Sequence, residues 1–97
     1  MANNRTKQGQ KKHDTGVANS ANWYKARGYK VEADLPGEKK PKNIGGFVPD
    51  LIAKKNSKEI IVEVETKKTA KTDTEQQAAF KKYANNSSKR TFKKKIV

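Results

Sequence analysis

The chain has no cysteine, so it can form neither disulfide bonds nor thiolate metal sites. It also lacks any apolar run close to the roughly 20 residues that a membrane-spanning helix needs. Residues 1–14 do not contain the apolar stretch of a signal peptide. From these three absences we expect a soluble, cytoplasmic protein.

Hydrophobic and acidic residues are both scarce. The 97 residues are 32% hydrophobic, and 10 Asp and Glu stand against 23 Lys and Arg, which gives a net charge of +13. Such a length predicts a single domain with a modest core, and burial of further apolar surface in a homodimer would stabilise it. The charge favours contact with nucleic acid, although lysines also simply keep a small protein in solution.

The hydrophobic pattern predicts one α/β domain in the order α-β-β-β-α-β, after a disordered basic arm over residues 1–13 that ends in a solvated His13. We expect helices over residues 14–27 and 74–84, and strands over residues 29–34, 47–53, 59–66 and 90–97. The basic loop at residues 35–46 suits contact with a phosphate backbone, and an ordinary solvated loop fits its composition equally well.

The first predicted helix has one apolar stripe. Val17, Ala21 and Tyr24 recur at helical spacing, and Gly28 is placed to end the helix in the left-handed conformation. Trp23 lies off this stripe, and core packing is the role that we expect for it, ahead of contact with a partner.

The most informative stretch holds three carboxylates. Asp50 lies near the start of one predicted strand, while Glu63 and Glu65 occupy alternate positions of the next and therefore point to the same face. A hairpin would bring Asp50 beside them. Three crowded carboxylates need a cation among them, either a lysine or a divalent metal, and a site made only of carboxylate oxygens suits Mg²⁺.

With Pro49-Asp50 on one strand and Glu63-Val64-Glu65 on the next, residues 14–97 resemble the PD-(D/E)XK nuclease superfamily, which includes restriction endonucleases and archaeal Holliday-junction resolvases. The resemblance implies a minimal restriction-endonuclease-like core, with a central mixed sheet flanked by helices. It also implies that Asp50 and Glu63 bind Mg²⁺, or Mn²⁺ as a substitute, and that the backbone carbonyl of Val64 can add a third oxygen.

Glu65 departs from the family pattern, because it stands where a lysine that activates the attacking water is expected. Some members also carry Glu there. Lys67, two residues further along the same strand face, is the candidate replacement, with a solvated surface role as the alternative. Gln76 on the following helix matches a site glutamine of several branches. Many branches also place a Glu on the first helix; this helix has none, and Glu32 or Asp34 is a weak substitute.

The resemblance therefore implies a Mg²⁺-dependent endonuclease that hydrolyses DNA phosphodiester bonds, directed by backbone or DNA shape, with catalytic residues Asp50, Glu63, Glu65, Lys67 and Gln76. RNA remains an alternative substrate. Two other functions fit the sequence: a catalytically inactive nucleic-acid-binding protein of the same fold, and a small structural subunit of a nucleoprotein assembly.

Overall fold

The structure, a computed structural model, describes residues 7–66 and 74–97. Its two helices and four strands follow the predicted order. Along the chain they are α1 (Lys7–Ala26), β1 (Lys30–Ala33), β2 (Leu51–Lys55), β3 (Lys58–Glu65), α2 (Thr74–Asn85) and β4 (Arg90–Ile96).

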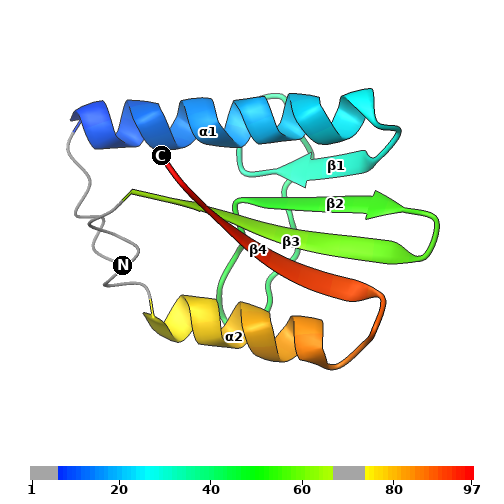
Figure 1. Cartoon of the computed structure of the whole chain (residues 1–97). Coiled ribbons are helices and arrows are strands. Elements are labelled where there is room, and N and C mark those ends of the chain that lie inside the picture. The colour runs from blue at the N-terminus through cyan, green and yellow to red at the C-terminus, as the bar shows by residue number, and fades with distance from the viewer. Residues whose placement is uncertain (1–6, 67–73) are drawn as a thin grey trace.

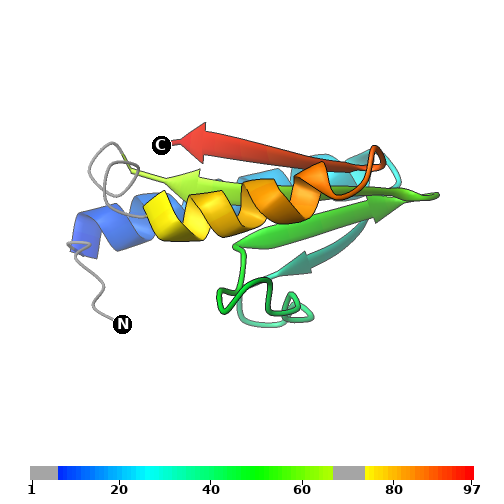
Figure 2. The same ribbon diagram turned by 90° about the horizontal axis from the view of Figure 1, so that it is seen from below.

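The four strands form one mixed sheet in the order β1-β2-β3-β4. β1 and β2 pair antiparallel, as do β2 and β3, whereas β3 and β4 run parallel. Figure 1 shows α1 on one face of this sheet and α2 on the other. Seen from below, α2 lies along the part of the sheet formed by β3 and β4 (Figure 2). The predicted mixed sheet flanked by helices is confirmed.

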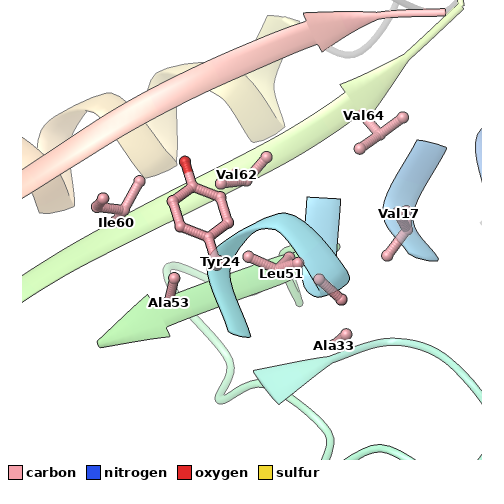
Figure 3. Packing of buried hydrophobic residues seen from close by; sticks show 9 residues of the cluster. Val17, Tyr24, Ala33, Leu51, Ala53, Ile60, Val62 and Val64 are labelled. Carbon is pink, nitrogen blue, oxygen red and sulfur yellow. The ribbon is translucent and has the colours of Figure 1, made fainter. Parts of the chain in front are cut away.

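The larger core lies between α1 and the sheet (Figure 3). The predicted stripe of Val17, Ala21 and Tyr24 is buried, and it packs on the apolar face of β3, which includes Val62 and Val64. Gly28 ends the helix region with a φ of +83°, as expected for a left-handed C-terminal glycine.

The helix begins at Lys7 and not at residue 14, so residues 7–13 belong to α1 rather than to an N-terminal arm. The buried side of α1 continues beyond Val17 through a polar residue, His13, which lies one turn earlier and is only 6% exposed. The apolar stripe therefore underestimates the length of this helix, because the N-terminal part of the helix buries a polar side chain and not an apolar one.

A second, smaller core lies between α2 and the opposite face of the sheet. Phe80 is fully buried there against Ile52 and Ile61, with Phe92 of β4 packed at its side. Because Glu63 follows Ile61 by two residues, it lies on this same face of the sheet. The α2 face of β3 is thus apolar at its start and acidic at its end.

Two further expectations about the fold were wrong. Trp23 is not a core residue: it is 49% exposed, and the guanidinium of Arg27 lies 3.6 Å from the centre of its ring. The second strand begins at Leu51 and not at residue 47, because Phe47 bridges back to Ile44 and Pro49 has no N–H for the ladder. Neither described helix combines the length and apolar character needed to cross a membrane.

Candidate active site

The three carboxylates predicted to meet do so where β2 begins and β3 ends. Asp50 directly precedes β2, and its side chain lies beside the last residues of β3 because Leu51 pairs with Val62. Asp50 is 9% exposed, while Glu63 and Glu65 are completely buried. Buried acidic side chains require hydrogen bonds or a cation to compensate for the loss of hydration.

Two reciprocal hydrogen bonds lock Asp50 to β3. The backbone N–H of Asp50 donates to Oε1 of Glu63 at 2.9 Å, and the backbone N–H of Val64 donates to Oδ2 of Asp50 at 2.9 Å. In a strand, the N–H and C=O of one residue point to the same side. The carbonyl of Val64 therefore points to the same side of β3 as the N–H of Val64, which is the side where Asp50 lies.

The first turn of α2 supplies a further partner. Gln76 donates from Nε2 to Oε2 of Glu63 at 2.8 Å, so the structure brings the predicted glutamine onto the predicted metal ligand. Phe80, one turn later, anchors α2 on the sheet and thereby holds Gln76 above Glu63. Both carboxylate oxygens of Glu63 thus accept hydrogen bonds from groups held by the fold.

His13 is the site residue that sequence reasoning missed. Far from being solvated, it is buried, and its Nε2 lies 3.0 Å from Oδ1 of Asp50, within ion-pair distance. Its Nδ1 lies 3.2 Å from Oδ1 of Asp14. One signal was available: His13 precedes Val17 by four residues, which places it on the buried side of a longer helix.

Burial and mutual repulsion dominate the electrostatics of the site. Burial, followed by the nearby charges of Asp50 and Glu65, raises the pKa of Glu63 to about 10, although the hydrogen bond from the Asp50 backbone opposes the shift. A side-chain hydrogen bond with Glu65 also raises this pKa. At neutral pH and without a neighbouring cation, Glu63 therefore holds a proton.

Of the other predicted residues, one lies at the site, one lies outside the described residues and two lie elsewhere. Glu65 lies beside Glu63 as expected, whereas Lys67 lies outside the described residues. Glu32 and Asp34, suggested as substitutes for a helix Glu, point elsewhere: Glu32 pairs with Lys39 and Lys54, and Asp34 pairs with Lys40. On the first helix, the residue that reaches the site is His13.

The donor atoms suit a hard cation. No group of three or more His, Cys, Asp and Glu side chains within residues 7–66 and 74–97 has the arrangement of a complete metal site. Mg²⁺ does not need one, because it is commonly held by one or two carboxylates and keeps several waters. Asp50 and Glu63 supply two such carboxylates.

Of three comparisons with known proteins, one gives a match. No curated protein and no solved structure matches the chain. A family model does match, over residues 5–93, which includes all described site residues. The match begins ahead of α1 and ends within β4, so it spans nearly the whole chain, and the protein therefore belongs to the AHJR-like family, described as REase_AHJR-like, a restriction-endonuclease-like family.

Proposed function

We propose that this protein is a Mg²⁺-dependent endonuclease that hydrolyses phosphodiester bonds of DNA. The observation that carries the proposal is the joint arrangement of Asp50 and Glu63. The backbone N–H of Asp50 bonds to the Glu63 carboxylate, the N–H of Val64 bonds to the Asp50 carboxylate, and burial together with acidic neighbours raises the pKa of Glu63 to about 10. A cation at this point would favour the ionised form of Glu63.

The proposed metal ligands are Asp50 and Glu63, with the carbonyl of Val64 as a third oxygen. When bound, Mg²⁺ neutralises charge on the scissile phosphate and activates a water for in-line attack. Gln76 fixes the orientation of Glu63, and His13 fixes that of Asp50. Glu65, or Lys67, positions the attacking water.

The excess of positive charge supports a polyanionic substrate. The net charge of +13 surrounds a small acidic centre, so the surface attracts DNA while the carboxylates hold the cation. The side chains of Lys39 and Lys40 in the loop after β1 are 82% and 73% exposed, and they remain available to phosphates despite loose pairing with acidic residues at 3.7 and 3.8 Å. We propose recognition through the backbone or shape of DNA, by a homodimer that cuts two strands.

The test is cleavage of labelled linear duplex, single-stranded and four-way-junction DNA in Mg²⁺, Mn²⁺ or EDTA. Asp50→Asn should abolish cleavage and leave DNA affinity nearly unchanged, because the carboxylate is lost but the shape is kept. Asp34→Asn is the matched control, since Asp34 is an exposed aspartate whose backbone N–H bonds to the carbonyl of Asp50. It should cleave like the parent protein.

A second readout separates metal binding from catalysis. Mg²⁺ should raise the melting temperature of the parent protein and of Asp34→Asn, but not of Asp50→Asn. Cleavage retained by Asp50→Asn would overturn the assignment of the site.

One observation favours a second candidate, a nucleic-acid-binding protein of the same fold without catalysis. Glu65 is fully buried at the position where the resemblance implies a lysine, and an ionised carboxylate there would repel an anionic phosphate where a lysine would attract it. This candidate predicts salt-sensitive DNA binding with no effect of Mg²⁺ on either melting or cleavage.

A further inference from the structure

We infer that the groove between α1 and β4 binds a single strand of nucleic acid, with an unpaired base stacked on Trp23. This surface lies on the α1 side of the sheet, whereas Glu63 and Glu65 lie on the α2 side. The identification of the strand as DNA rests on the proposed function, but the binding itself does not require cleavage.

The groove consists of two adjoining hollows of about 620 and 450 Å³, which share Asn19 and Lys95 in their walls. Each is comparable in size to a pocket for a drug-sized ligand, which accommodates a nucleotide or two but not a duplex. Because α1 rises about 1.5 Å per residue, the stretch of α1 from Lys12 to Trp23 gives the groove a length of roughly 17 Å.

The groove is strongly basic. Five lysines line it, and of its described lining residues none is acidic. These lysines are Lys11, Lys12, Lys93, Lys94 and Lys95. The ammonium of Lys94 bonds to Gln77 of α2, so the other four supply the positive charge of the groove. Its floor is apolar, since Tyr24 and Val62 lie at one end and Val97 at the other. An apolar floor with a cationic rim complements a strand whose bases are unpaired and whose phosphates face outward.

Trp23 provides the aromatic platform that such a groove needs. Its ring lines the groove and is 49% exposed, and Arg27 covers part of it at 3.6 Å in a cation–π contact. An exposed tryptophan held by an arginine presents a fixed aromatic surface, and stacking on it is possible for every base because each base has a π-face. No role in the core explains this residue.

The groove leads toward the candidate active site. Lys11 and Lys12 immediately precede His13, which contacts Asp50. At the same end, the backbone N–H of Val97 donates to the carbonyl of Glu65 at 2.8 Å. A strand lying along the groove would therefore run from Trp23 to the edge of the carboxylate cluster, as an unpaired arm of a branched substrate would.

Two alternative occupants are less compatible with these observations. A second copy of this chain has the same positive charge, and the lysines of the edge strand β4 oppose pairing with another strand. A duplex is too wide for hollows of this size.

The test uses Trp23 itself, since it is the only tryptophan of the chain. In EDTA, short oligo-dT and oligo-U strands should quench its fluorescence, and the stronger ligand of the two identifies the natural strand as DNA or RNA. Heparin, a polyanion without bases, should not. Lys93→Ala combined with Lys95→Ala should weaken binding about tenfold or more and flatten the slope of log Kd against log salt by about 1.4, because two phosphate contacts are lost.

The matched control is Lys81→Ala with Lys82→Ala, which removes the same charge from exposed positions of α2 and should change binding little. Trp23→Ala, followed by anisotropy of a labelled strand, should weaken binding about tenfold. Unchanged fluorescence with both strands, equal quenching by heparin, or burial of Trp23 in a protein dimer would overturn the groove assignment. This outcome is independent of catalysis. If the protein does not cleave DNA but single strands quench Trp23, the groove assignment is supported. If the protein cleaves DNA but single strands do not quench Trp23, the assignment is refuted.

Discussion

At the scale of single residues, Glu63 is the most informative side chain. It is completely buried, it accepts hydrogen bonds from Asp50 and Gln76, and its pKa rises to about 10 because burial and two acidic neighbours disfavour its charge. A residue retained at such a cost to folding is more typical of a functional site than of a core.

The raised pKa has a consequence for stability. Since the pKa of Glu63 in the folded protein is above the unfolded value of 4.5, the folded state holds its proton more tightly. In EDTA, the contribution of Glu63 to the free energy of unfolding should be largest below about pH 4.5. It should decrease as the pH rises toward 10. Glu63→Gln should remove this fall and melt at a higher temperature at pH 8, measured by thermal denaturation between pH 5 and 9.

Glu59 offers a control of opposite sign. Burial alone would raise its pKa, but hydrogen bonds from Tyr83 and Lys42 outweigh burial and hold the pKa below its ordinary value. Its contribution is present above pH 4.5 and is lost as the pH falls through the folded pKa. Glu59→Gln should therefore lower stability at neutral pH, and a Glu63→Gln variant that loses stability in the same way would contradict our reading of Glu63.

At the scale of elements, the two helices hold the two proposed metal ligands from opposite faces of the sheet. α1 brings His13 to Asp50, and α2 brings Gln76 to Glu63. The hairpin of β2 and β3 sets both carboxylates side by side, but only the helices restrict their orientation. Each helix is in turn held by its own core, α1 through Val17 and α2 through Phe80.

We predict that His13→Ala lowers the rate of DNA cleavage about 10- to 100-fold, the usual range for residues that orient a metal ligand. His13→Gln keeps a donor in the same region and should restore part of the rate. Single-turnover cleavage at a series of Mg²⁺ concentrations distinguishes positioning from a merely structural role: in the positioning role, more Mg²⁺ is needed for half-maximal rate. The matched control is Asn22→Ala, an exposed position of the same helix that lines neither hollow of the groove, assayed on linear duplex. An unchanged Mg²⁺ requirement in His13→Ala would refute the positioning role.

At the scale of the whole molecule, the acidic cluster and the basic groove occupy different places. The acidic cluster lies at one end of the sheet, while lysines line the groove between α1 and β4. A folded unit with a modest core and one proposed site can cut only one strand at a time. We therefore predict a homodimer, with a mass near twice the 10.9 kDa of one chain by light scattering.

A monomeric mass at assay concentrations would contradict the dimer, and it would predict nicking of supercoiled DNA instead of paired cuts. A dimer that also buries Trp23 would assign the α1–β4 groove to the interface. The same pair of measurements, mass and tryptophan fluorescence, therefore decides both the proposed homodimer and the proposed single-strand groove.

The sequence by itself determined the element order and the meeting of Asp50 with Glu63, and its family resemblance implied the mixed sheet and the place of Gln76. Period-two alternation and a short polar turn leave few ways to arrange a β2–β3 hairpin, and the order of elements follows from local pattern. The tertiary structure alone decided the start of α1, the burial of His13 and the exposure of Trp23. These features depend on which face of a helix meets which part of the sheet. A polar residue that pairs with a buried carboxylate adds nothing to the apolar pattern of the helix, so the pattern cannot predict its burial.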